Sequence, residues 1–227
     1  MSRTRLNWRR MAGEATLIVV SVFVAIVLEG LWQERVQAGE ARAALGQLLE
    51  ELKQDRVSLD AVVARQSEID VLWGNARAWL ANPDTLPSDE FHDALDSIVL
   101  DNRTLYVRRS AWANLVTNSH LPLLKDPVLV GHLSDHYENR NTILDLNNNM
   151  YDATAMAIMR ESATEIWDGD NRVLLTTDAL ALSIFRGKIR HLHIVWNKWY
   201  LDFMSDYVVA LDQLIADVES YLEKYGD

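Results

Sequence analysis

The sequence predicts an all-α protein in which an N-terminal transmembrane helix is followed by an antiparallel helical bundle. An uncharged apolar run at 15–28 follows a cluster of arginines, later segments repeat apolar residues at intervals of three and four, and no segment alternates as strands do. With nine glycines and four prolines in 227 residues, the chain has no linker-like stretch. We therefore expect a cytoplasmic N-terminus at 1–11, a transmembrane helix at 12–32 and one extracytoplasmic helical-bundle domain at 33–227.

The predicted anchor extends beyond its uncharged centre. Residues 15–28 alone are shorter than the roughly 20 apolar residues that a spanning helix needs. Trp8 and Trp32 are 24 positions apart, roughly 36 Å along a helix, so one indole can lie at each interface of a core about 30 Å thick. Glu14 and Glu29 then lie near the two edges, where carboxylates can reach headgroups. An alternative is that Glu29 faces a partner helix.

Two other interpretations of this segment are open. In the first, it is a secretory signal that is cleaved after Val36-Gln37-Ala38. That site lies ten residues beyond Leu28 and follows the charged stretch 29–35, which favours a retained anchor. In the second, it is a buried helix of a soluble core, which leaves the N-terminal arginines unexplained.

The distribution of basic residues predicts the orientation of the anchor. Four arginines precede it, whereas two follow it closely among several glutamates: Arg3, Arg5, Arg9 and Arg10, against Arg35 and Arg42. Basic residues are retained on the cytoplasmic side of a single span. We therefore expect a single-pass protein of the inner (plasma) membrane, with a cytoplasmic N-terminus and a periplasmic or otherwise extracytoplasmic bulk.

Composition excludes several classes of function. Residues 15–227 carry 18 basic and 32 acidic residues, a net charge of −14, which disfavours binding to nucleic acid and to anionic surfaces in general. The chain has no cysteine, so disulfides, thiolate catalysis and cysteine–zinc sites are all excluded.

The first extramembrane helix should continue directly from the anchor. Its stripe, which follows the heptad spacing of packed helices, consists of Leu45, Leu48, Leu52, Asp55, Leu59, Val62, Gln66, Ile69, Trp73, Ala76 and Leu80. The helix should end at Asn82-Pro83, since the residue before proline avoids the α region.

Shorter elements follow. Ser88 is a plausible N-cap of a helix that ends near Asp101. Residues 104–107 are expected to be extended, and Ser110 to cap a second short helix that ends before Leu121-Pro122.

Two long helices complete the prediction. Asp126-Pro127 combines an N-cap with proline at the first helical position, and that helix should end near Asp168. Thr177 or Asp178 should cap the last helix. Its expected apolar stripe is Leu192, Trp196, Trp199, Phe203, Tyr207, Leu211, Leu214, Val218, Tyr221 and Tyr225.

Three stretches carry a wider resemblance. The anchor begins with Gly13-Glu14 and ends in AIVLEGLWQER, the next helix contains LGQLLEELKQD, and a later segment is SAWANLVTNSHLPLLKDPVLVGHLSDHYE. They resemble a family of uncharacterised bacterial single-pass membrane proteins, grouped as domain of unknown function 6090. The chain differs at His120, where the family tends to have glycine, and at His136-Tyr137, where it has paired tyrosines. The resemblance implies a single-pass topology and a helical fold, without an activity, ligand or catalytic residue.

His132 and His136 are the candidates for a metal site. They are four residues apart in a predicted helix, a spacing at which two side chains can bind one ion. The hydrolase motif of this spacing has glutamate after the first histidine, where this chain has Leu133. A third ligand has to come from another helix, such as His120 or His92. Because no third ligand is evident, two surface or packing histidines are the simpler interpretation, and we expect no metal and no other cofactor.

Two further groups of residues have alternative interpretations. The polar stretch from Asn139 to Asn149 is unusual in a helix, because asparagine is a poor helix former. It either lines a polar interior that binds a small polar ligand, or it forms a solvated face, a local kink or a helix end shifted by several residues. A cluster of aromatic residues at helical spacing predicts core packing. Any part of the cluster that is exposed would instead indicate a partner-binding patch. Its members are Trp196, Trp199, Tyr200 and Phe203.

Some residues suggest self-association. Ser21 and Ala25 form a pair of small residues four apart, which lets two helices approach closely in lipid. Asp55 and Gln66 interrupt the apolar stripe, as polar residues do when they fix the register between helices. With Glu29, these residues are the candidates for contacts in a parallel homodimer. The alternative is that the stripe packs within one subunit.

The sequence favours an interaction role over catalysis. It has no glycine-rich phosphate loop and no G-x-S-x-G motif, so we expect that the protein is not an enzyme. We expect a membrane-anchored interaction or assembly module whose partners are the lipid bilayer and a second copy or another envelope protein. An extracytoplasmic ligand-sensing module that signals through a partner is the alternative, and a metal-dependent hydrolase is the more distant one.

Overall fold

The structure is a computed structural model that describes residues 8–82, 88–100, 104–162 and 165–225, with the backbone alone described at 8–16, 66–67 and 88. Over these residues the protein is all-α apart from one small hairpin, which confirms the all-α part of the predicted fold class. The α-helices are α1 (Trp8–Ala81), α2 (Ser88–Leu95), α3 (Ser110–Thr117), α4 (Pro127–Ser134), α5 (Asn141–Ser162), α6 (Ala179–Ile194) and α7 (Asp202–Tyr225).

Shorter elements connect these helices. The π-helical turns η2 (Asp96–Leu100), η4 (Asp135–Arg140) and η5 (Val195–Leu201) extend α2, join α4 to α5 and join α6 to α7. A 3-10 turn, η3 (Leu121–Leu123), precedes α4. The strands β1 (Trp167–Asp168) and β2 (Val173–Leu174) pair antiparallel in a hairpin that the sequence analysis did not predict.

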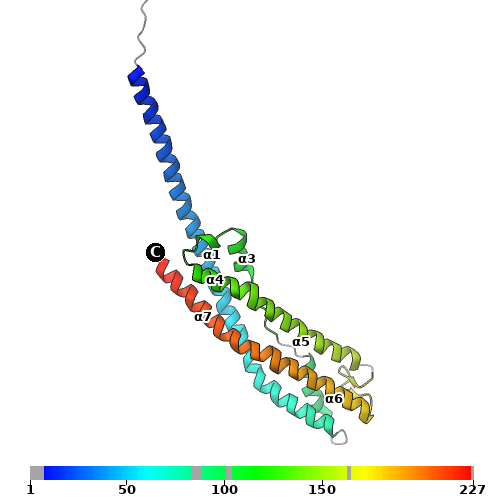
Figure 1. Cartoon of the computed structure of the whole chain (residues 1–227). Helices are drawn as coiled ribbons and strands as arrows, with labels where there is room; N and C mark the ends of the chain where they lie inside the picture. Colours follow the sequence, from blue (N-terminus) through cyan, green and yellow to red (C-terminus); the bar gives the residue numbers. More distant parts are fainter. Residues whose placement is uncertain (1–7, 83–87, 101–103, 163–164, 226–227) are drawn as a thin grey trace, which may run out of the picture.

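The helix α1 is one continuous element of 74 residues, roughly 110 Å long. Its N-terminal part stands clear of the rest of the protein, and residues 17–37 are exposed (Figure 1). Within the described residues, this is the helix long and apolar enough to cross a membrane. The predicted boundary between residues 32 and 33 therefore lies inside an unbroken helix.

The second half of α1 forms one side of the core. Every member of its predicted stripe is buried except Gln66, whose side chain lies outside the described residues. This half packs against α2, α3, α6 and α7. The apolar N-terminal segment and this side of the core are thus parts of one continuous helix.

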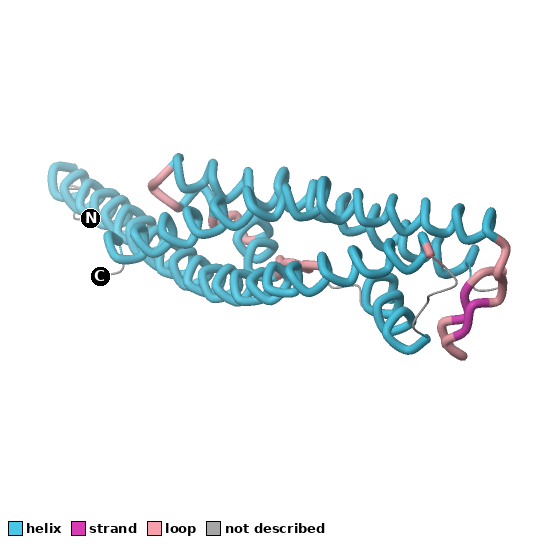
Figure 2. The backbone as a smooth tube through the Cα atoms, turned by 90° about the horizontal axis from the view of Figure 1, so that it is seen from below, coloured by secondary structure: helices cyan, strands magenta, loops and turns pink. Residues whose placement is uncertain are grey.

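The remaining long helices form a layer alongside α1. The continuous helix from α4 to α5 runs away from the exposed end of α1, and the continuous helix from α6 to α7 returns (Figure 1). The hairpin lies at the far end of the body (Figure 2). The C-terminal end of α7 comes back to α1, where the Arg42 guanidinium donates a hydrogen bond to the Tyr225 carbonyl.

Two of the predicted helix N-termini have the side-chain caps that the sequence indicates. The Asp126 carboxylate accepts hydrogen bonds from the N–H groups of Val128 and Leu129 at 3.0 and 3.1 Å. Asp178, rather than Thr177, caps α6 in the same way. The cap predicted at Ser110 is wrong, because its hydroxyl donates to the Glu51 carboxylate instead.

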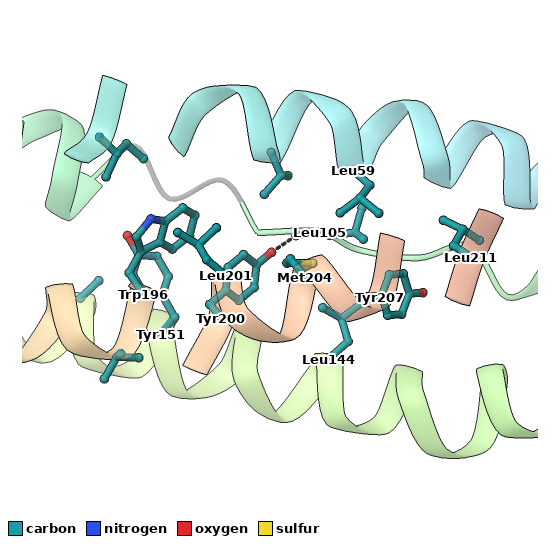
Figure 3. Close-up of a cluster of buried hydrophobic side chains, with 14 of the residues drawn as sticks. Leu59, Leu105, Leu144, Tyr151, Trp196, Tyr200, Leu201, Met204, Tyr207 and Leu211 are labelled. Atoms are coloured by element: carbon teal, nitrogen blue, oxygen red, sulfur yellow. Dashed lines mark hydrogen bonds between the residues drawn. The ribbon is translucent and has the colours of Figure 1, made fainter. Parts of the chain in front are cut away.

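The segment at 104–109 belongs to no helix or strand, and it crosses the middle of the body as an extended trace between α1 and the α5–α7 layer (Figure 3). Six extended residues span up to about 20 Å, which a helix of the same length does not. This segment connects η2 to α3 through the core.

The predicted stripe of the last helix requires a correction. Trp199 is 59% exposed and Phe203 is only partly buried, whereas Tyr200 and Met204 are buried. The reason is η5: a π-helical turn closes with an i→i+5 hydrogen bond, so it takes one residue more than an α-helical turn. The inward face therefore shifts by one residue between Trp196 and Tyr207.

This shift gives a stability prediction. Trp196→Ala removes a fully buried indole and should lower the free energy of unfolding by about 3–5 kcal/mol. Trp199→Ala should change it by no more than about 0.5 kcal/mol, as expected of a surface substitution. Chemical denaturation of the purified chain measures both values. A larger loss for the Trp199 variant would show that the inward face follows the α-helical stripe.

Candidate functional site

The extended segment is held by side chains that replace the partners of a strand. Leu105 is buried, and its N–H donates to the Tyr200 hydroxyl at 2.6 Å (Figure 3). Its carbonyl accepts from the Asn148 amide at 2.8 Å. A buried backbone group without a partner costs about 1–3 kcal/mol. Burial raises the pKa of Tyr200, so its hydroxyl stays neutral and keeps this bond.

Asp55 fixes the next part of the segment. It is 1% exposed, and its carboxylate accepts from the Arg108 N–H at 3.0 Å and from the Arg108 guanidinium at 2.6 Å. Burial raises the pKa of Asp55, although Arg108 acts in the opposite direction. This carboxylate therefore has its partner within the chain, and its role needs no second subunit. Whether Asp55 also faces a second copy stays a prediction.

The end of the segment is bound on both sides. The Arg109 guanidinium donates to Asp145 at 2.6 Å and to the Asn141 carbonyl at 3.3 Å, both on α5. The Glu51 carboxylate on α1 accepts from the hydroxyl of Ser110 and from the N–H of Ala111. The segment and the start of α3 thus connect α1 to α5.

A buried polar cluster lies between η4, α5 and α7. The Tyr207 hydroxyl donates to the Asn141 side-chain oxygen at 2.7 Å and lies 3.3 Å from His136 Nε2. Because the hydroxyl has one proton, this network assigns the proton of His136 to Nε2. His136 Nδ1 and Asn141 Nδ2 are buried without a hydrogen-bond partner in the described parts of the chain. Burial lowers the pKa of His136 to about 4, with Arg140 adding to the effect.

The two candidate metal ligands have different surroundings. His132 is exposed, and its Nδ1 lies 2.7 Å from the Asp217 carboxylate, whereas His136 is 2% exposed and points into the cluster around Tyr207. Both line a small cavity of about 170 Å³ together with Asp135 and Arg140. Among the described residues, no group of three or more histidine and acidic side chains could hold a metal ion.

The suggested third ligands lie elsewhere. His92 accepts a hydrogen bond from the Trp167 indole at 3.0 Å, near the hairpin. His120 precedes η3 and lines a separate polar groove. The structure therefore does not bring these histidines together with His132 and His136.

The asparagine-rich stretch makes mostly contacts within the chain. Asn141 and Asn148 are buried, and Asn147 donates to the Trp199 carbonyl at 3.2 Å. Asn139 donates to the Asp135 carboxylate on its own helix. Asn141 and Asn148 are seven residues apart and share the inward face with Leu144 and Tyr151, a spacing that could have identified them as core amides.

The candidate dimer residues in the apolar N-terminal segment of α1 are exposed. Ser21, Ala25 and Glu29 are exposed, and the Ser21 hydroxyl donates to the Leu17 carbonyl one turn before it at 2.8 Å. The side chain of Gln66 lies outside the described residues. The predicted homodimer therefore stays a prediction.

Comparison with protein-family models, with curated proteins and with solved structures finds no match for this chain. The resemblance to domain of unknown function 6090 accordingly stays a prediction.

The Leu105 contacts give a prediction about packing. Tyr200→Phe keeps the ring but leaves the Leu105 N–H without its acceptor, so the free energy of unfolding should fall by about 1–3 kcal/mol. Tyr106→Phe is the matched control, because that side chain is 65% exposed and should lose less than about 0.5 kcal/mol. Equal losses in urea titrations of the two variants would contradict this role of Tyr200.

The surroundings of His136 predict a pH dependence. Because the pKa is about 4 in the folded state and 6.5 unfolded, the unfolded chain binds more protons between these values. The stabilisation by neutral His136 is complete above pH 6.5 and is lost as the pH falls to 4, by about 3 kcal/mol in total. Asp55 has a raised pKa and therefore stabilises the folded state as the pH falls, which opposes the effect of His136. Both the wild type and the variant His136→Gln contain Asp55, so the difference between them isolates the contribution of His136. The difference in unfolding free energy should shrink as the pH falls through this range. A difference that does not depend on pH would show that His136 is not buried in its neutral form.

Proposed function

We propose that the protein is a single-pass inner-membrane protein whose extracytoplasmic domain, an acidic antiparallel helical bundle, serves as an interaction or assembly module of the cell envelope. The observation that carries this proposal is the continuity of α1. Its exposed N-terminal segment has no charge between residues 15 and 28, and its second half supplies the core stripe from Leu45 to Leu80. An exposed apolar surface of this size marks a membrane or partner contact.

The absence of a hinge in α1 supports an architectural role. A helix that passes from the lipid into the core without a break fixes the height and the tilt of the domain above the membrane. The acidic surface of this domain, with a net charge of −14 over residues 15–227, keeps it from lying on an anionic membrane. Such a domain presents its distal end, which includes the β1–β2 hairpin, to other envelope components (Figure 2).

The orientation predicts the outcome of a fusion experiment. Arg3, Arg5, Arg9 and Arg10 should keep the N-terminus in the cytoplasm. A reporter that is active only in the periplasm, fused after Asp227, should therefore be active, and a cytoplasmic reporter at the same position should be silent. The reverse pattern would overturn the orientation. Recovery of a soluble chain that begins at Gly39 would show that the segment is a cleaved signal.

Self-association through the anchor is the second testable part of the proposal. Ser21 and Ala25 are exposed and one turn apart, which suits a close parallel contact in lipid. Ala25→Leu should convert a crosslinkable dimer into a monomer in bilayers, because the larger side chain separates the helices. Val19→Leu, a substitution of another exposed residue in the same segment, is the control and should leave the dimer intact. A monomeric wild type, or an unchanged Ala25 variant, would exclude this dimer face.

A sensing role is the second candidate, and a polar groove favours it. The groove has a volume of about 630 Å³ between α1 and α3, where the exposed part of α1 enters the body. Its polar lining residues are Gln37, Glu40, Gln47, Asn114, Asn118, Ser119 and His120, and they lie beside Ala43, Ala44 and Leu123. A polar ligand bound there would act directly on the helix that enters the membrane. An increase in melting temperature with small polar compounds, lost in Asn118→Ala, would favour sensing over assembly.

A further inference from the structure

A second groove lies along α1 beside the C-terminal end of α7, at the membrane-facing end of the body. Its volume is about 520 Å³. Its part nearest the N-terminus is apolar and exposed, with Leu28 at 61%, Leu31 at 55% and Trp32 at 69%. Its part nearest the body is cationic, with Arg35 and Arg42 on α1 and Lys125 on the loop before α4. Glu34 is the acidic residue in the lining.

The spacing along α1 matches the layers of a bilayer leaflet. If the predicted span ends at Trp32, Arg35 lies about 4.5 Å further along the helix axis. The headgroup region on each side of the hydrocarbon core is roughly 5–8 Å thick. Arg35 therefore lies at the level of lipid phosphates, while Leu28 and Leu31 lie at the level of the first acyl carbons.

Arg35 and Lys125 in this groove are available for an anion, whereas the Arg42 guanidinium is already bound to backbone carbonyls. Elsewhere on this acidic chain, basic side chains mostly pair with carboxylates, as Lys53 does with Glu219 and Lys188 with Glu161. In the described part of the chain, no carboxylate lies within 4.0 Å of a cationic nitrogen of Arg35, Arg42 or Lys125. Arg42 instead donates to the carbonyls of Ala38 and Tyr225, so it adds positive charge at a fixed place.

We propose that this juxtamembrane groove binds the phosphate of a phospholipid from the outer leaflet, with Arg35 and Lys125 on the phosphate and Leu28, Leu31 and Trp32 along the start of the acyl chains. The inference rests on the proposed anchoring of α1 in a membrane. The body carries a net negative charge, so the rest of its surface repels anionic headgroups. Contact with the lipid phosphate is therefore confined to this groove. A bound lipid would fill the space between α1 and the loop before α4 and hold the body at a fixed height.

Native mass spectrometry of the full-length chain in detergent tests the proposal. With phosphatidylglycerol as the probe, the wild type should retain one lipid. The double variant Arg35→Gln/Lys125→Gln should bind it at least about tenfold more weakly, as expected for the loss of charge-assisted hydrogen bonds. The control is Arg190→Gln/Lys198→Gln, which removes the same charge from exposed positions on α6 and η5 and should leave binding unchanged.

Three results would overturn the proposal. If the wild type retains no lipid, or if the control variant loses as much lipid binding as Arg35→Gln/Lys125→Gln, the groove is not the binding site. Displacement of the lipid by millimolar inorganic phosphate would assign the cations to a soluble anion instead of a lipid.

Carbonate extraction of native membranes separates this inference from the proposed anchor. If the wild-type chain stays in the membrane but retains no lipid in the mass spectrum, only the groove proposal is wrong. If carbonate extracts the wild-type chain from the membrane, the proposed anchor is wrong, and the groove proposal that rests on it is wrong as well.

Discussion

The fold depends on one constraint, which is the passage of an extended, partly buried peptide through a body built of helices. A helix satisfies its own backbone groups, but residues 104–108 belong to no helix and have no neighbouring strand in the described part of the chain. The side chains of Asp55, Asn148 and Tyr200 supply the missing partners. These three come from α1, α5 and η5, so the interactions that satisfy the segment also fix the three long helical elements relative to one another.

The π-helical turns make these contacts possible. Tyr200 belongs to η5, where the inward face has shifted by one residue, and His136 and Tyr137 belong to η4. Without the shift at η5, the aromatic ring at 199 would point inward and the Tyr200 hydroxyl would be displaced from the Leu105 N–H. Such turns are frequently found at functional sites. Here they position polar side chains at the centre of the body, and the same body continues through α1 into the apolar N-terminal segment.

Much of the helix content could be predicted from the sequence, because its signals are local. The stripe from Leu45 to Leu80, the cap at Asp126 and the extended conformation near Leu105 all follow from spacing or from residue type. Other features depend on contacts between distant residues. The exposed position of Trp199 follows from a π-helical turn that periodicity does not reveal, because a single extra residue leaves the apolar pattern almost unchanged.

The candidate site was less predictable for the same reason. Asp55 stands out as a polar residue in an apolar stripe. Its partner Arg108 is 53 positions away, and no local sequence pattern indicates that the two residues meet. The His132–His136 spacing suggested a shared ligand, yet tertiary packing buries one ring against Tyr207 and leaves the other beside Asp217. The grooves beside α1 form only where α3 and the loop before α4 come back to it, so spacing along the chain could not locate them.

Amide hydrogen exchange of the full-length chain tests the central claim most directly. If the extended segment is part of the core, the amides of Leu105 and Arg108 should exchange as slowly as the core amides of α1 near Leu52 and Leu59, through global unfolding. If these two amides instead exchange as fast as those of the exposed turn at 169–172, the segment opens independently. In that case it does not hold the helices together.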